Sequence, residues 1–268
     1  MPFDLQALYA DPDAVVVTAH RGFSGCYPEN TLGAFAAALD LGVDILEFDL
    51  RGTRDGVPIV LHDATLARTA DRPGAPGDYT LVEIKTFAAS YWRGPHDTGV
   101  KLSAPADPAA RIPTFEELLD AVGTEIGLNI QVYDTSPPLL AEICRLYRAY
   151  DLYARGYLTL STFDEAARVR GLDPDIDVCI LAPAGSLKRE ALERRRAFGC
   201  RTVQPRRADV TPEFCAAARA LGLGANMFYA NTAADARTYV EMGLQGLLTD
   251  RPDLILQALD NLGRRRAL

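Results

Sequence analysis

Residues 45–63 read ILEFDLRGTRDGVPIVLHD, and this stretch decides the fold. Its two apolar runs, 45–50 and 57–61, are typical of β-strands. The residues between Gly52 and Val57 end on Asp55-Gly56, which is a hairpin signal. The sequence therefore predicts that the two strands pair antiparallel.

This hairpin also predicts a register, in which Gly52, the last residue before the turn, pairs with Val57, the first residue after it. In that register Glu47 lies opposite His62, and Asp49 lies opposite Val60. A carboxylate and an imidazole from distant sequence positions would thus lie close together. An ordinary surface hairpin is the alternative.

From Val15 onward, short β-branched runs alternate with stretches of helical period, a pattern typical of repeated β-α units around a parallel sheet. Once the second hairpin strand is set aside, eight strands remain, and a (β/α)8 TIM barrel is their natural closure. The predicted strands are 15–19, 45–50, 128–132, 157–161, 177–181, 202–205, 225–228 and 246–249. Helices are predicted between them, for example at 114–122, 137–150 and 211–221.

One long connection interrupts this alternation. Residues 71–111, after the hairpin, are rich in proline and glycine and too long for a plain loop, so we expect an insertion that forms a lid or small subregion. No second independent unit is apparent, and residues 1–268 are expected to form a single barrel domain.

Composition limits the partners and the compartment. Hydrophobic residues make up 48% of the 268, which is enough for a large core. The formal net charge of -8 argues against a nucleic-acid surface or an anionic membrane surface, because both need a positive field. The sequence shows neither a signal-peptide pattern nor a run of roughly 20 apolar residues, and its five widely spaced cysteines are typical of reduced thiols. We therefore expect a cytoplasmic protein without stable membrane insertion, its oligomeric state being left open.

Glu47 and Asp49 form the first chemical feature. They lie two positions apart on one strand, so both side chains point to the same face. An inward face cannot hold two bare carboxylates without a cation, and a hard divalent metal with oxygen ligands is the simplest neutraliser. The alternative is that both carboxylates lie on a solvated face.

Two histidines end strands near this pair, His20 before Arg21 and His62 before Asp63. In such barrels, side chains at the carboxyl ends of strands face the substrate. Phosphodiester cleavage needs one group that deprotonates a nucleophile, another that protonates the leaving alkoxide, and positive charge for the phosphoryl oxygens. His20, His62, Arg21 and a metal would supply that set.

Three features lie outside this set. Asn30 or Thr31 is expected to cap the first helix. His96, within 71–111, is expected to be an exposed loop residue, with a part in a substrate lid as the alternative. The run Arg264–Arg266 is expected to be a solvated tail rather than a nucleic-acid contact.

Five linked motifs carry a family resemblance. They are His20-Arg21-Gly22, Pro28-Glu29-Asn30-Thr31, Glu47-Phe48-Asp49, Thr53-Arg54-Asp55-Gly56, and His62-Asp63 with Leu66, Arg68 and Thr69. In this order they resemble the signature of the glycerophosphodiester phosphodiesterase family. Residues 112–117 and 246–252 resemble the family too, so the similarity spans nearly the whole chain.

The resemblance implies a phosphatidylinositol-phosphodiesterase-like TIM barrel that hydrolyses a glycerophosphodiester, or a related alcohol or sugar phosphodiester, to a phosphomonoester and an alcohol. Its substrate is a small molecule, and its cofactor is calcium or magnesium. In the family mechanism a neighbouring glycerol hydroxyl attacks phosphorus and water opens the resulting cyclic phosphate, while the pair matching His20 and His62 exchanges the protons. Arg21 would hold phosphate, Glu29 would orient the site or bind the metal, and the carboxylate pair would ligate the metal.

The strand at 128–132 departs from the family pattern. The family normally has a glutamate metal ligand and a phosphate-binding lysine two apart there, and this chain has Gln131 and Tyr133. Gln131 keeps a ligand oxygen without the charge, and Tyr133 offers one hydrogen bond in place of an ammonium. Because one charge of each sign is lost, the net charge of the site is unchanged, which favours a retuned site. Asp134 would replace the missing carboxylate only at a bulge or a strand end.

Phe228 stands where the family usually has tryptophan. It is expected to pack against the alcohol or glycerol group of the substrate, with a purely structural core position as the alternative. Two other functions stay open at this point. One is a lyase-type phospholipase that releases a cyclic phosphate, and the other is a non-catalytic protein that binds phosphate esters.

Overall fold

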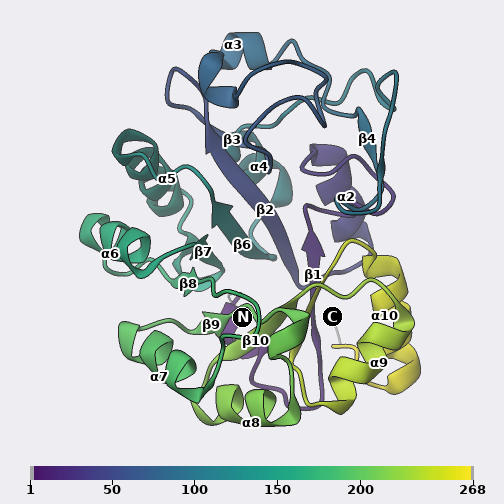
Figure 1. The fold of residues 1–268 in the computed structure, drawn as a ribbon, viewed down its shortest axis with the longest axis vertical. Coiled ribbons are helices and arrows are strands. Elements are labelled where there is room, and N and C mark those ends of the chain that lie inside the picture. The colour runs from purple at the N-terminus through teal and green to yellow at the C-terminus, as the bar shows by residue number, and fades with distance from the viewer. Residues whose placement is uncertain (1–2, 267–268) are drawn as a thin grey trace.

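The computed structural model describes residues 3–266, with eight parallel strands at the centre and helices around them (Figure 1). The strands are β1 (Val16–His20), β2 (Ile45–Gly52), β6 (Gly127–Val132), β7 (Gly156–Leu160), β8 (Val178–Ile180), β9 (Thr202–Val203), β10 (Gly224–Phe228) and β11 (Gly246–Thr249). The sheet runs in the order β8-β7-β6-β2-β1-β11-β10-β9, and its curvature brings the two end strands, β8 and β9, next to each other. The predicted (β/α)8 barrel is confirmed, nearly closed.

Helices alternate with the strands, and five of them begin at a threonine cap. The alternating helices are α2 (Leu32–Asp40), α4 (Phe115–Val122), α5 (Pro137–Ala149), α6 (Phe163–Leu172), α7 (Arg189–Phe198), α8 (Pro212–Ala220), α9 (Ala233–Glu241) and α10 (Pro252–Leu262). A threonine is the N-cap of α2, α4, α6, α8 and α9, and in each case its hydroxyl accepts a backbone N–H of the first turn. Thr31 caps α2, which leaves the side chain of Asn30 free for another contact.

The hairpin is antiparallel as predicted, but its register is one residue off the prediction. Strand β3 (Pro58–Val60) pairs Leu50 with Val60. The peptide N–H of Thr53 donates to Val57 at 3.1 Å and the Thr53 hydroxyl accepts the N–H of Val57 at 2.9 Å, so the turn has three residues instead of four. Gly56 adopts the positive φ that a three-residue turn of this kind needs.

The expected pairings of Glu47 with His62 and of Asp49 with Val60 are therefore wrong. The backbone of Asp49 instead accepts the N–H of Leu61 at 2.9 Å. His62 follows the hairpin as a loop residue, and its carbonyl accepts the Arg51 Nε at 2.7 Å.

The insertion covers one side of the barrel mouth and has a small core of its own. It carries α3 (Leu81–Ile84) and a two-stranded ribbon of β4 (Trp92–Arg93) and β5 (Val100–Lys101), which lie at the top of Figure 1. Apolar side chains from β3, from the insertion and from the residues that flank the insertion form this core, and they are Ile59, Leu61, Leu66, Ala70, Ile84, Phe87, Ala89 and Ile112. This packing fixes the loop that follows β3.

The opposite end of the barrel is closed by the chain termini. Helix α1 (Leu5–Leu8) packs with buried residues of β1, β2, β7 and β8. Arg264 pairs with Asp13 at 2.7 Å and Arg266 with Asp44 at 3.0 Å, so the arginine run is not a solvated tail as expected. Within residues 3–266, no helix is long and apolar enough to cross a membrane.

Candidate active site

A cavity of about 250 Å³ opens at the carboxyl ends of the strands. Six of the residues predicted from the sequence line it, namely His20, Arg21, His62, Gln131, Tyr133 and Phe228. The other lining side chains are His96, Asp97, Leu181, Gln204, Arg206, Tyr229 and Asp250. The barrel topology thus gathers side chains from eight separate strand ends or loops around one space.

His20 ends β1 and is almost fully buried, with 2% of its surface exposed. Its Nδ1 lies 2.7 Å from Oδ1 of Asp250, which the chain supplies just after β11. Asp250 is held in turn by the Ser24 hydroxyl at 2.8 Å and by the Asn231 amide at 2.7 Å. Burial raises the pKa of Asp250, but the charge and hydrogen bond of His20 outweigh it and lower that pKa to about 2. Since Nδ1 is occupied, Nε2 is the nitrogen of His20 left for a substrate.

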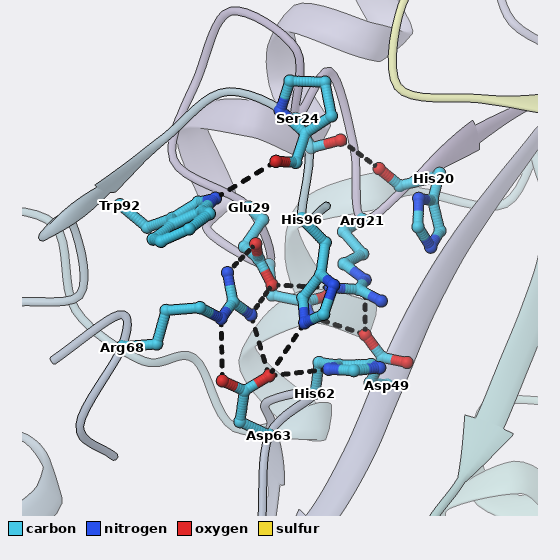
Figure 2. A network of polar contacts seen from close by, with 12 residues as sticks. His20, Arg21, Ser24, Glu29, Asp49, His62, Asp63, Arg68, Trp92 and His96 are labelled. Atoms are coloured by element: carbon cyan, nitrogen blue, oxygen red, sulfur yellow. Dashed lines mark hydrogen bonds and ion pairs between the residues drawn. The ribbon is translucent and has the colours of Figure 1, made fainter. Parts of the chain in front are cut away.

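His62 is held in the same way by a different carboxylate. Its Nδ1 lies 2.7 Å from Oδ1 of Asp63, and Arg68 binds both oxygens of Asp63, at 2.7 and 2.8 Å (Figure 2). Burial raises the pKa of Asp63, and the hydrogen bonds from His62 and Arg68 reverse the shift and hold it well below its usual range. Tyr133 meets the His62 ring edge-on, with the ring centroids 5.1 Å apart. Nε2 of His62 is again the free nitrogen.

Glu47 and Asp49 are both 1% exposed on β2. Burial raises the pKa of Glu47 well above its usual range, and the neighbouring Asp49 adds to the rise. Oδ2 of Asp49 accepts the amide of Asn30 at 2.8 Å and lies 3.2 Å from Nε of Arg21. Oδ1 of Asp49 is buried without a hydrogen-bond partner among the described residues.

This arrangement fits an oxygen-liganded cation. Gln131 on β6 pairs in register with Asp49, so its side chain points to the same face of the sheet as the two carboxylates of the neighbouring strand β2. Arg21 supplies positive charge beside this buried pair of carboxylates, but it is shared with Glu29, and one oxygen of Asp49 has no partner among the described residues. A hard divalent cation would supply the charge that is still missing. The donor set of two carboxylates and one amide oxygen is of the kind that calcium or magnesium accepts.

Glu29 does not line the cavity. It connects Arg21, the residue after His20, with Arg68, which holds Asp63 beside His62. Its carboxylate accepts hydrogen bonds from Nη1 of Arg21 at 2.9 Å and from two Arg68 nitrogens at 2.6 and 2.7 Å (Figure 2). Burial raises its pKa, and the hydrogen bonds and charges of Arg68 and Arg21 lower it to about 2. In this arrangement Glu29 positions two guanidinium groups, and both of its oxygens are already used.

The end of strand β6, where the sequence departs from the family pattern, lines two separate cavities. Tyr133 is partly exposed at 36%, and burial raises its pKa above the usual range, with Asp49 and Glu47 adding to the rise, so the phenol keeps its proton. Asp134 faces a separate depression beside Arg51, and its Oδ1 accepts the N–H of Ser136 at 2.9 Å. Asp134 therefore does not join Gln131.

Phe228 lies at the end of β10 and packs edge-on against His20, with the ring centroids 5.2 Å apart. Tyr229 follows it and stacks on the same imidazole at 5.9 Å. Phe228 is partly exposed to the cavity and is not buried in the core. Both aromatic rings restrict the orientation of His20.

The structure corrects the expectation for His96. Its ring lies against His62, with the centroids 4.9 Å apart, and it lines the cavity from the insertion. Its Nδ1 is 3.0 Å from Oδ1 of Asp97, and Asp97 accepts a hydrogen bond from the Tyr229 hydroxyl. A contact between the insertion and the loop after β10 therefore spans the cavity mouth.

His62, Asp63 and His96 also bring three possible ligand atoms within 4.8 Å of one another. Because Arg68 already binds both oxygens of Asp63, we interpret this cluster as the group that orients His62. Oδ1 of Asp49, which has no partner among the described residues, is a better ligand for a metal than this cluster.

The sequence reasoning missed several groups in this site. Asp250, Tyr229 and Asp97 had no assigned role, and Asp63 and Arg68 appeared only as motif letters. The one signal available for Asp250 was its place directly after the last strand, where a barrel site draws its residues. Nothing local marked Asp97 or Tyr229.

Comparisons with known proteins agree with this geometry. The model of the glycerophosphoryl diester phosphodiesterase family matches residues 20–254. A glycerophosphodiester phosphodiesterase of Bacillus subtilis is 28% identical over 254 residues, which cover 91% of this chain and 86% of the relative.

Solved structures share the fold over the same extent. One from Silicibacter pomeroyi superposes with a TM-score of 0.84 at 25% identity, covering 98% of this chain and 99% of the other. A phosphodiesterase of Oleispira antarctica, solved with the product sn-glycerol-3-phosphate, has a TM-score of 0.76 at 25% identity and covers 92% and 97%.

Proposed function

Because this chain belongs to the glycerophosphoryl diester phosphodiesterase family, a family of phosphoric diester hydrolases, we propose that it hydrolyses a glycerophosphodiester, or a related alcohol or sugar phosphodiester, to a phosphomonoester and an alcohol. The observation that carries the proposal is the pair of histidines lining one cavity, each with its Nδ1 bound to a carboxylate. The product bound to the Oleispira antarctica enzyme supports sn-glycerol 3-phosphate as the phosphomonoester.

The two histidines supply the proton transfers. A carboxylate on Nδ1 fixes the tautomer and orientation of an imidazole and stabilises its protonated form. Nε2 of one histidine then removes the proton of the attacking glycerol hydroxyl, and Nε2 of the other donates a proton to the leaving alkoxide. When water opens the cyclic phosphate, each histidine performs the reverse transfer.

The remaining residues hold the substrate and its charge. Arg21 binds a phosphoryl oxygen while Glu29 holds its guanidinium in place. The Tyr133 phenol donates a hydrogen bond in place of the family lysine, and Phe228 packs against the glycerol or alcohol group. Glu47, Asp49 and Gln131 would hold calcium or magnesium. A divalent cation there supplies positive charge for the phosphoryl oxygens.

Phosphorus NMR tests the proposal. The protein is incubated with glycerophosphocholine, with and without calcium, magnesium and manganese, and the phosphorus products are followed in time. We expect the diester signal to give way to a phosphomonoester, with a divalent cation required.

The same spectra separate the alternatives. A cyclic phosphate that persists identifies a lyase that does not complete hydrolysis. A diester signal that stays unchanged with every metal, for several diesters, together with calorimetric binding of a phosphate ester, identifies a non-catalytic binding protein and overturns the proposal.

A further inference from the structure

The charged side chains that line the cavity are all paired except one. Arg21 pairs with Glu29 at 2.9 Å, Asp250 with His20 at 2.7 Å, and Asp97 with His96 at 3.0 Å. Arg206 lines the same cavity, and no carboxylate of residues 3–266 lies within 4.0 Å of its guanidinium. It is a permanent cation without a counter-ion at the mouth of the site.

The backbone and one aromatic ring hold Arg206 in this position. Arg206 follows β9 and forms a bridge to Phe228 in the parallel direction, and its backbone N–H donates to Asp209 at 3.1 Å. Its guanidinium carbon lies 5.6 Å from the centroid of the Phe228 ring, within the range of a cation–π contact. These contacts leave the guanidinium donors free.

The Phe228 ring separates Arg206 from His20. Phe228 contacts His20, with the ring centroids 5.2 Å apart, and the Arg206 guanidinium, which lies 5.6 Å from the centroid of the Phe228 ring. The cleaved bond must lie within reach of Nε2 of His20 and of His62. A group that meets Arg206 is therefore a part of the substrate attached to the phosphodiester and not the phosphodiester itself.

The neighbouring surface adds a second donor. Gln204, two residues earlier after the same strand, is 5% exposed and lines the cavity. Its amide oxygen accepts the Cys179 thiol at 4.0 Å, which leaves the amide nitrogen as a donor. A guanidinium and an amide on one strand end are suited to a carboxylate or a phosphate oxygen. Asp97, the anion on the same rim, is engaged by His96 and Tyr229.

We propose that Arg206, with Gln204, forms a subsite for an anionic group on the alcohol portion of the substrate, so that diesters with a carboxylate or second phosphate there are preferred. This inference rests on the proposed hydrolysis and names the class of its substrate. Arg206 acts as a specificity-determining residue, outside the proton transfers.

Two diesters that differ by a single carboxylate test it. Glycerophosphoserine carries the group and glycerophosphoethanolamine lacks it. We expect kcat/KM of the wild type to be about tenfold or more higher for glycerophosphoserine, since a hydrogen bond to a charged group contributes of this order. Arg206→Gln should lower kcat/KM for glycerophosphoserine about 10- to 100-fold and leave glycerophosphoethanolamine within about twofold. Arg206→Lys should keep part of the preference.

Arg207 provides the matched control. It is the next residue, but it pairs with Asp235 at 2.8 Å and does not line the cavity. Arg207→Gln should keep the preference for the carboxylate. An equal loss on both diesters with Arg206→Gln, or no loss on either, overturns the subsite.

The outcomes distinguish this subsite from the reaction itself. A wild type that hydrolyses both diesters equally well refutes only the subsite. If neither of these two diesters is hydrolysed, the phosphorus NMR test with several diesters decides the proposed function, and calorimetric titration of the same two compounds into wild type and Arg206→Gln decides the subsite. Tighter binding of glycerophosphoserine that is lost in Arg206→Gln supports it, and equal binding overturns it.

Discussion

The site contains two histidine–carboxylate pairs, His20 with Asp250 and His62 with Asp63, and each pair is called an arm below. The two arms have the same chemistry, but different parts of the molecule hold them in place. His20 and Asp250 come from β1 and the end of β11, inside the barrel, and their side chains are each 3% exposed. His62 and Asp63 come from the loop after the hairpin, and their side chains are 21% and 18% exposed. The first arm is fixed by the packed barrel, whereas the second is fixed by an ion-pair network through Arg68 and by the insertion. The barrel scaffold therefore places one proposed proton-transfer group rigidly and leaves the other dependent on a peripheral segment.

The largest expected effect comes from removing either imidazole. His20→Asn and His62→Asn should each lower kcat by about 10²- to 10⁴-fold, because each removes a proton-transfer group. Steady-state kinetics on glycerophosphocholine measures the loss, and circular dichroism checks the fold. A variant with near-normal turnover would remove its histidine from the mechanism.

Removing the two carboxylates that bind the histidines should lower kcat/KM by different amounts. The loss should be larger for Asp250, which is more deeply buried than Asp63. Asp250→Asn should lower kcat/KM about 10²- to 10³-fold, because it changes the tautomer and orientation of a buried histidine. The other carboxylate near this histidine, Glu47, is 3.9 Å from Nε2 and does not hold Nδ1. Asp63→Asn should cost about tenfold, because solvent reaches His62 and partly replaces the lost partner.

Asp260→Asn is the control for these variants. Asp260 is an exposed carboxylate that pairs with Arg265 far from the cavity, so its loss should leave kcat/KM unchanged. Equal losses for Asp250→Asn and Asp63→Asn would erase the contrast between the two arms.

The carboxylate pair beside the buried arm should bind a cation more tightly when a third carboxylate is added. Gln131→Glu should lower the Kd for calcium or magnesium about tenfold, measured by calorimetry without substrate. Gln257→Glu on the exposed face of α10 makes the same charge change away from the site and should have no effect. An unchanged Kd for Gln131→Glu would mean that Gln131 is not a ligand.

The smallest expected effect comes from Glu29, which connects Arg21, beside one arm, with Arg68, beside the other. The folded-state pKa of Glu29, about 2, lies below its ordinary value of 4.5. Its stabilisation is therefore fully present above about pH 4.5 and is lost as the pH falls towards 2. The cost of Glu29→Gln in urea denaturation should be smaller at about pH 3.5 than at about pH 6, by about 1 kcal/mol. A cost that does not change with pH would show that Glu29 is not held ionised by Arg21 and Arg68.

Features that depend on residues close together in the sequence could be predicted, whereas features that depend on distant residues could not. The strand alternation and the threonine caps are local, and the eight strands and the helices appear where the pattern predicted them. The hairpin register failed by one residue because a side-chain hydrogen bond of Thr53 decides the turn length, which a dipeptide signal does not encode.

The partners within the site were harder to predict. Asp250 is 230 positions from His20, and only closure of the barrel brings β11 beside β1. His96 reaches His62 through the packing of the insertion, for which the sequence shows no period. The residue types of the site were therefore predictable, whereas the carboxylate that each histidine binds required the folded chain.

The most direct test of the central claim, that His20 and His62 divide the two proton transfers, is a comparison of leaving groups. Wild type, His20→Asn and His62→Asn are assayed on a glycerophosphodiester with an alkyl alcohol and on one with p-nitrophenol, whose anion leaves without a proton. We predict that one variant recovers most of its rate of alcohol release on the p-nitrophenyl ester and that the other does not, because only the general acid of the first step becomes dispensable. Equal impairment of both variants on both substrates, or equal recovery of both, would contradict the division of roles.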